Sequence, residues 1–172
     1  PDQAGLISQE ALGEMAYTRV AFELEDLAIA VMPVDHTKDA HSPSAWKMTN
    51  AIESWSWEAV RNAAKIEVYT RADHVKLYIN GKCIGTKKPK NDCKVFFDTT
   101  YQNGEIKAVA YDANDNIIVE RTLTTAGKET ILVAEPELTR VNADTDLCYV
   151  RMRYTDENGH TKPLAKAESG LL

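Results

Sequence analysis

The sequence predicts a mainly β fold, an immunoglobulin-like antiparallel β-sandwich with an N-terminal helix and extended segment. Polar and apolar residues alternate with a period of two along several short runs, the pattern of strands that bury one face. Asn-Gly pairs, which favour tight turns between strands, occur beside these runs. The turns recur about every ten residues, which is the rhythm of an antiparallel sandwich.

The stretch from Lys65 to Gly85 (KIEVYTRADHVKLYINGKCIG) predicts a β-hairpin. Alternate residues of two runs share one face: Ile66, Val68 and Thr70, then Val75, Leu77 and Ile79. Asn80 and Gly81 tolerate the positive φ of a type I′ turn, so residues 82–84 are the predicted returning strand. The alternation continues through residues 93–98, 106–110 and 117–123. Six strands are therefore expected between residues 65 and 124, and the sandwich domain is placed at residues 50–126.

Residues 1–49 are the predicted lead-in segment. Ser8 can cap a helix that reaches to about Glu25, because apolar residues follow it at helical spacing. The short apolar run from Leu27 to Val34 predicts a buried strand, and the polar residues 35–43 predict a loop.

Residues 127–172 are predicted to form a partial, truncated second immunoglobulin-like module. Ala126-Gly127-Lys128 indicates a hinge, and the strand pattern returns in residues 131–134 and 148–154. So short a unit buries too little apolar surface to be stable alone. We therefore expect that it is truncated or that it leans on the sandwich.

Composition narrows the classes of partner. Hydrophobic residues make up 44% of the 172 residues, charged residues 27%, and the formal net charge is −6. The acidic balance argues against nucleic acid or an anionic membrane as a partner. The longest apolar run is too short to span a bilayer. No signal peptide is visible and the chain opens on Pro1, so we expect a piece of a longer protein.

The cysteines and histidines predict no cofactor and no metal site. Cys83, Cys93 and Cys148 each lie in a strand pattern, where small buried side chains are expected rather than a disulfide framework. Free cysteines favour a reducing, cytoplasmic compartment. The four histidines show no metal-ligand spacing.

The three tryptophans, Trp46, Trp55 and Trp57, are the candidate ligand-binding residues. If residues 55–57 are extended, the indoles of Trp55 and Trp57 project to the same side. Two such rings can stack on a sugar, and their N–H groups can donate to hydroxyls. The alternative is that they cover the β-core, as large aromatic side chains usually do.

Several motifs, taken together, resemble a β-sandwich of glycoside hydrolase family 2. They are SWSWE, IEVYTRADHVKLYINGKCIGTK, GEIKAVAYDANDNII and TTAG, in this order. The resemblance covers about residues 50 to 127 and is closest to the module after the catalytic barrel in bacterial β-galactosidase-like enzymes. The following residues match the family pattern: Val68, Tyr69, Thr70, Ala72, Asp73, Val75, Leu77, Asn80, Gly81, Lys82, Gly85, Gly104, Lys107, Ala108, Val109, Ala110 and Tyr111. The region after Thr130 resembles the start of the next immunoglobulin-like module.

The resemblance implies that the catalytic residues lie elsewhere. Family 2 enzymes act through two barrel glutamates, one of them in an Asn-Glu pair, with carboxyls about 5–5.5 Å apart for retention of configuration. This chain has no Asn-Glu pair and no alternating strand–helix run that could form a barrel. Its sandwich-region glutamates are expected at strand edges or at solvent-facing positions: Glu53, Glu58, Glu67, Glu105 and Glu120.

We therefore expect a non-catalytic accessory portion of a β-galactosidase-like enzyme of carbohydrate metabolism. The chain alone is expected to hydrolyse nothing, and its parent is expected to be a retaining glycoside hydrolase. Its expected partner is the catalytic barrel of the parent chain. Two alternatives are a carbohydrate-binding module that uses surface tryptophans and an immunoglobulin-like protein-interaction domain. Exposure of the tryptophans separates the first alternative from an accessory role.

Overall fold

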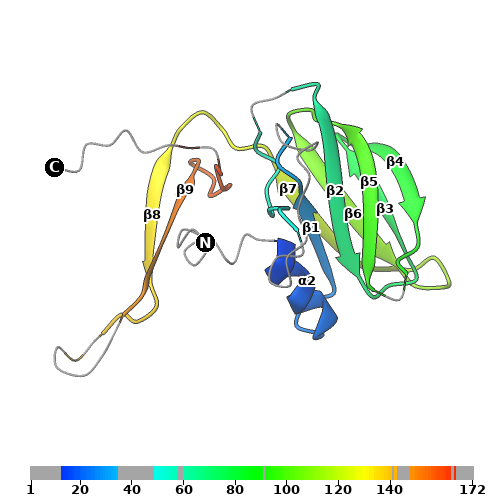
Figure 1. Ribbon diagram of the computed structural model, residues 1–172, viewed down its shortest axis with the longest axis horizontal. Helices are drawn as coiled ribbons and strands as arrows, with labels where there is room; N and C mark the ends of the chain where they lie inside the picture. Colours follow the sequence, from blue (N-terminus) through cyan, green and yellow to red (C-terminus); the bar gives the residue numbers. More distant parts are fainter. Residues whose placement is uncertain are drawn as a thin grey trace.

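The computed structural model describes residues 13–34, 49–57, 60–90, 92–140, 142, 148–163 and 165, and the statements below concern these residues. Most of them lie in a β-sandwich, and a separate two-stranded ribbon stands beside it (Figure 1). One short helix packs on the outside of the sandwich. The fold is thus mainly β, as predicted. No described helix is long and apolar enough to cross a membrane.

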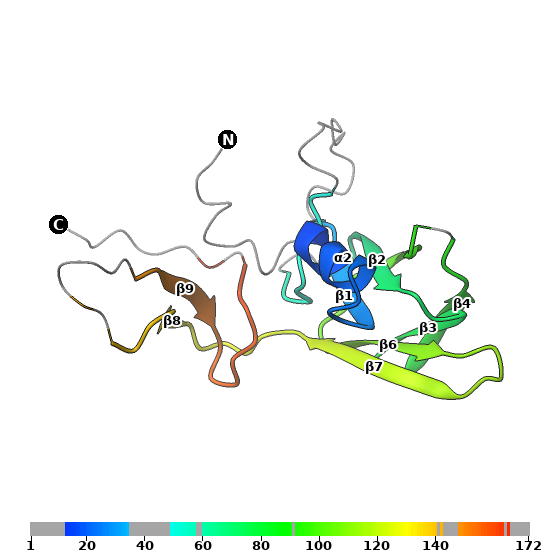
Figure 2. The same cartoon turned by 90° about the horizontal axis from the view of Figure 1, so that it is seen from below.

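The sandwich has two antiparallel sheets, seen as two layers in Figure 2. The first has the order β1-β2-β5: Leu27–Val31 (β1), Ala63–Thr70 (β2) and Lys94–Thr100 (β5). The second has the order β4-β3-β6-β7: Lys82–Lys87 (β4), His74–Ile79 (β3), Glu105–Tyr111 (β6) and Ile117–Thr124 (β7). The strands from β2 to β7 are the six strands predicted between residues 65 and 124.

Inward-facing apolar side chains of both sheets meet in one core. Ile66 and Val68 of β2 and Leu77 of β3 are among its fully buried members. Each such side chain contributes about 1.5–3 kcal/mol relative to an exposed one. Trp55 and Tyr101 lie in the same core, with ring centroids 4.8 Å apart in an edge-to-face arrangement.

The predicted hairpin is present as β3 and β4. Asn80 and Gly81 have φ of 49° and 79°, the two positive values that a type I′ turn requires. A β-bulge interrupts the pairing with β4 between Leu77 and Tyr78. The Asn80 carboxamide also accepts from the Glu105 backbone N–H at 2.8 Å, so this turn is bound to the start of β6.

Helix α2, Gly13–Ala21, lies on the outer face of the first sheet (Figure 1). It ends before the predicted Glu25, because Glu23 has φ of 62°, which a right-handed helix cannot contain. The predicted start, Ser8, lies outside the described residues. The helix forms a second apolar cluster with the sheet, made by Ala16, Val20, Ala28, Ala30, Ala51 and Tyr69.

Strand β1 comes from the segment that was predicted to lead into the sandwich. Its five residues are all buried, because the core covers one face and α2 covers the other. It pairs with β2 from Leu27 opposite Thr70 to Val31 opposite Ile66. The buried strand predicted at Leu27–Val34 is therefore present, and the sandwich takes one of its edge strands from residues 1–49.

The ribbon consists of β8, Ile131–Pro136, and β9, Val150–Thr155, paired antiparallel. Within the described residues, it pairs with no strand of the sandwich. It occupies the region predicted as a partial second module, and that interpretation remains a prediction.

The cysteines are free, but they are not the buried strand residues that the pattern predicted. Cys83 is exposed on β4, and Cys93 and Cys148 are partly exposed. Cys93 has φ of 58° and lies in the turn before β5, not in the strand. Its carbonyl accepts from the N–H of Thr70, at the end of β2, at 3.0 Å. A backbone hydrogen bond therefore holds the residue in place, and its side chain is not part of the core.

Candidate functional site

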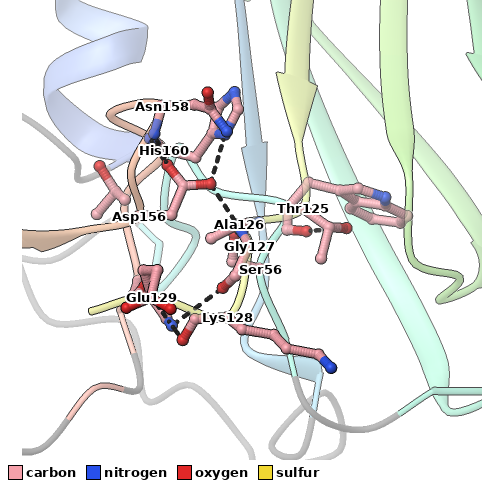
Figure 3. Close-up of polar contacts among 12 residues, drawn as sticks. Ser56, Thr125, Ala126, Gly127, Lys128, Glu129, Asp156, Asn158 and His160 are labelled. Atoms are coloured by element: carbon pink, nitrogen blue, oxygen red, sulfur yellow. Dashed lines mark hydrogen bonds and ion pairs between the residues drawn. The ribbon is translucent and has the colours of Figure 1, made fainter. Parts of the chain in front are cut away.

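The candidate site is a cluster of hydrogen-bonded polar groups at the junction between the sandwich and the ribbon. The linker runs from the end of β7 at Thr124 to the start of β8 at Ile131. Its first half touches the Ser54–Trp57 segment, and its second half touches the loop after β9 (Figure 3). The linker therefore has hydrogen-bond partners in both units.

On the sandwich side, Tyr101 and Thr125 fix the start of the linker. The buried Tyr101 hydroxyl accepts from the Trp57 backbone N–H at 3.0 Å and lies 3.2 Å from the Trp55 carbonyl. The Thr125 hydroxyl donates to the same carbonyl at 2.8 Å. One residue later, the Ala126 N–H donates to the Ser56 hydroxyl at 2.9 Å (Figure 3). These contacts make the linker continuous with the core.

On the ribbon side, Asp156 gathers four donors. Its Oδ2 accepts from the Gly127 N–H at 2.7 Å and lies 2.8 Å from Nδ1 of His160 (Figure 3). Its Oδ1 accepts from the backbone N–H groups of Asn158 at 2.9 Å and His160 at 2.8 Å. The side chain is only 1% exposed. Burial alone would raise the pKa of Asp156, but these hydrogen bonds outweigh it and hold the pKa well below the ordinary range.

Lys162 holds the middle of the linker. Its Nζ donates to three successive carbonyls, those of Gly127 at 3.1 Å, Lys128 at 3.0 Å and Glu129 at 2.9 Å. An ammonium group has three N–H donors, so all of them are used here. Ser54 adds a contact between the two units, because its hydroxyl donates to the Thr161 carbonyl at 3.3 Å.

An open hollow of about 600 Å³ lies at this junction. Its polar lining includes Ser56, Thr125 and Lys162, whose side chains already bind the backbone as described above. Among the described residues that line it there is no aspartate, glutamate, histidine or cysteine. Among the described residues there is also no cluster of three such side chains that could hold a metal ion. The hydrogen bonds of the junction are thus suited to fixing two units relative to each other.

The structure places two of the three candidate tryptophans in the core. Trp55 is 0% exposed and Trp57 is 5% exposed. A sugar needs an open ring face to stack on, so these two side chains match the alternative in which they cover the core. Trp46 lies outside the described residues. The sequence could not separate the two alternatives. The spacing of Trp55 and Trp57 predicts that their side chains lie on the same side of an extended segment, but it does not predict whether other residues cover that side.

Glu67, which was expected at a strand edge or a solvent-facing position, is buried, and Glu53 is partly buried. Glu67 is 7% exposed, and its carboxylate accepts from the hydroxyls of Thr49 at 2.7 Å and Tyr69 at 2.5 Å. Glu53 accepts from Arg19 of α2 at 2.7 Å. The expectation was wrong for Glu67, because α2 and the segment before β2 cover this outer face of the sheet. Neither glutamate lines the junction hollow or the second hollow, of about 440 Å³, beside Asp73.

The two carboxylates differ in how far they are hydrogen-bonded: both oxygens of Glu67 accept, whereas Oε1 of Glu53 has no hydrogen-bond partner among the described residues. Burial raises the pKa of Glu53, against the opposing effect of the Arg19 guanidinium. Burial, reinforced by the neighbouring Glu67, likewise raises the pKa of Tyr69. Nε of Arg19 also donates to the Glu25 carboxylate at 3.0 Å, so the two ion pairs tie α2 to the loop before β1 and to the segment before β2.

Comparison with known proteins finds a family model and a relative that match parts of this chain. Residues 62–119 match the family model described as "Domain of unknown function (DUF4982)". The chain is 30% identical over 111 residues to the β-galactosidase BoGH2A of Bacteroides ovatus, an alignment that covers 63% of this chain and 13% of that protein. The chain therefore spans a small part of the length of this relative.

Solved structures show the same fold. A glycosyl hydrolase family 2 member from Bacteroides cellulosilyticus DSM 14838 superposes with a TM-score of 0.72 at 21% identity, over 89% of this chain and 21% of that one. A β-glucuronidase from glycoside hydrolase family 2 superposes with a TM-score of 0.56 at 24% identity, over 66% of this chain and 12% of that one. The chain thus has the fold of one portion of these longer proteins.

Proposed function

We propose that this chain is a non-catalytic accessory portion of a longer glycoside hydrolase, in which it holds neighbouring modules in a fixed orientation. The observation that carries the proposal is the junction. Its buried carboxylate and its ammonium group bind backbone groups of the linker, an arrangement that supports a structural role. One relative is a β-galactosidase and another is a β-glucuronidase. This difference supports a role for this portion that does not depend on the substrate.

In this proposal the parent hydrolyses a glycosidic bond with retention, through two carboxylates about 5–5.5 Å apart that lie outside this chain. The catalytic barrel of the parent is the proposed partner of the sandwich. Carbohydrate binding through Trp46 stays a prediction.

A hydrolysis assay tests the absence of catalysis. The isolated chain is expected to release no nitrophenol from nitrophenyl β-galactoside or β-glucuronide above the rate of buffer. Glu53→Gln and Glu67→Gln are the matched variants, because Glu67 is buried and the Glu53 side chain is only 10% exposed. Turnover that one of these substitutions abolishes would refute the proposal.

Deletion tests the accessory role. Removal of residues 50–126 from the full-length polypeptide is expected to lower its melting temperature and its soluble yield, because the barrel loses its packing partner. A deletion variant that melts like the intact polypeptide would contradict the proposed role.

A further inference from the structure

One side of the sandwich ends in two edge strands, β4 and β5. β4 is the last strand in the order β4-β3-β6-β7, and β5 is the last in the order β1-β2-β5 (Figure 1). An edge strand presents unpaired N–H and C=O groups, to which a strand of another molecule can bind. On the opposite side the edge of β1 is partly covered, because Val31 and Ile52 exchange backbone hydrogen bonds of 2.8 and 2.9 Å. Among the described residues, no backbone covers β4 in this way.

β4, with the sequence KCIGTK, carries charge only at its two ends, Lys82 and Lys87. The register places Lys82 opposite Ile79 and Lys87 opposite Val75, and both partners belong to the core. Residues opposite each other on paired strands share a face, so both lysines leave β4 on the side that faces the other sheet. Both are nevertheless exposed, because β4 lies at the open side of the sandwich. Inward-pointing charges on an edge strand oppose the addition of another strand.

Lys87 also reaches the edge of the other sheet. Its Nζ donates to the Phe96 carbonyl of β5 at 2.5 Å and lies 5.1 Å from the centroid of the Phe97 ring. The contact occupies a backbone acceptor of β5 and places a positive charge beside it. A strand that paired with β4 or β5 here would have to displace this ammonium group or bury it away from water, which is costly for a charged group.

The spacing of the two lysines opposes one added strand in particular, a second copy of β4. When two identical antiparallel strands pair along their full length about a two-fold axis, the first residue of each lies opposite the last residue of the other. For β4 this arrangement places Lys82 opposite Lys87 twice. Like charges directly opposite each other destabilise a strand pair. The four residues between the lysines are uncharged and include no proline, so they do not oppose pairing.

We infer that Lys82 and Lys87 prevent β4 from pairing with β4 of a second copy of this chain. The inference rests on the strand order, the register of β3 with β4 and the contact of Lys87 with β5. It does not depend on the proposed function. The two lysines thus keep this side of the sandwich free of edge-to-edge association.

Charge reversal tests the inference. Lys82→Glu would turn both like-charge pairs of the self-paired strands into opposite-charge pairs, and it leaves Lys87 in contact with Phe96. Sedimentation of the 172-residue chain at low ionic strength is expected to show self-association that is about tenfold tighter than that of the unaltered chain. Lys82→Glu/Lys87→Glu restores two like-charge pairs and is expected to associate no more tightly than the unaltered chain.

Net charge alone predicts the opposite order. Lys82→Glu makes the formal net charge of −6 more negative by two, which increases the general repulsion between copies. Lys76→Glu is the matched control, because it makes the same change of charge on β3, whose two edges are both paired. It is expected to associate no more tightly than the unaltered chain. Hydrogen exchange locates the contact, since amides of residues 82–87 are expected to gain protection in the Lys82→Glu dimer.

Three results would overturn the inference. The first is self-association of Lys82→Glu that is no tighter than that of Lys76→Glu. The second is a double variant that associates as tightly as Lys82→Glu, because the pairing of opposite charges would then not be the cause. The third is a dimer whose new protection lies on β7 instead of residues 82–87.

Discussion

Tyr101 serves two parts of the chain with one buried hydroxyl. Replacement by Phe keeps the ring against Trp55 but leaves the Trp57 N–H without its acceptor. An unsatisfied buried donor costs about 1–3 kcal/mol, so Tyr101→Phe is expected to lower the free energy of unfolding by that amount. Urea unfolding followed by tryptophan fluorescence measures it. Tyr149→Phe is the control, because Tyr149 is 71% exposed.

An equal stability of Tyr101→Phe and the Tyr149→Phe control would contradict this assignment. It would mean that the Trp57 N–H finds another acceptor once the hydroxyl is removed.

Asp156 makes the junction sensitive to acid in a definite direction. Because its folded pKa lies below the ordinary value near 3.9, the folded state favours the charged form more than the unfolded state does. Its contribution is therefore present above pH 4 and is lost as the pH falls below that value. The difference in unfolding free energy between the wild type and Asp156→Asn is expected to be largest near pH 6 and to shrink on acidification.

Taking the difference in unfolding free energy between the wild type and Asp156→Asn removes the contributions of the other acidic residues. Asp73 and Asp112 also have lowered pKa values, through contacts with His74 and Lys88 and with Asn116, respectively, but both are present in the two proteins. Denaturant titrations at several pH values give the difference. A difference that stays constant from pH 6 to pH 2.5 would rule out Asp156 as its source.

At the junction, the sequence predicts local chemistry but not long-range partners. Asp156-Glu157-Asn158-Gly159 has the composition of a turn, and Asp156 does accept from the Asn158 N–H two residues on. Nothing in that stretch indicates that the same carboxylate binds Gly127, 29 residues earlier. The burial of Glu67 was missed for the same reason, since a helix distant in sequence covers the strand.

Among the elements, the β3–β4 hairpin and the loop before β6 are joined through Asn80. Its carboxamide donates to the Asn103 carbonyl at 3.0 Å and accepts from the Glu105 N–H at 2.8 Å. Gly104 has φ of 122°, and a Cβ there would overlap the Asn80 carboxamide. Gly81 has φ of 79° with open space around it. The two glycines thus share positive φ but differ in packing.

Gly81→Ala is expected to destabilise the chain by about 1–2 kcal/mol, through backbone strain alone. Gly104→Ala is expected to destabilise it further, because Asn80 must also leave both of its partners. Thermal unfolding of the two variants gives the comparison. Equal losses would show that the Asn80 contacts contribute nothing to stability.

The elements themselves were largely predictable. Period-two alternation and Asn-Gly turns predict β2 to β7, because one face of each strand packs on the core, although in β4 and β7 that face is only partly buried. The pattern could not show that β1 joins β2, since a run buried on both faces, such as Leu27–Val31, carries no alternation. The turn conformation of Cys93 was missed because an apolar residue at a strand end fits both a strand and a turn.

For the whole molecule, the account requires the sandwich and the ribbon to behave as one body. They share no strand pairing, so their relative position depends on the linker contacts of Asp156 and Lys162. Lys162→Met keeps the aliphatic length but removes the ammonium donors to three carbonyls. The variant is expected to fold and to lose the fixed orientation of its two units.

The most direct test of this central claim is the distance distribution between two spin labels. Two native cysteines provide the sites, Cys83 on β4 and Cys148 beside β9, once Cys93 is replaced by Ser. The account predicts a single narrow distribution for the otherwise unaltered chain and one at least twofold broader for Lys162→Met. A broad distribution in the unaltered chain, equal to that of the variant, would contradict it.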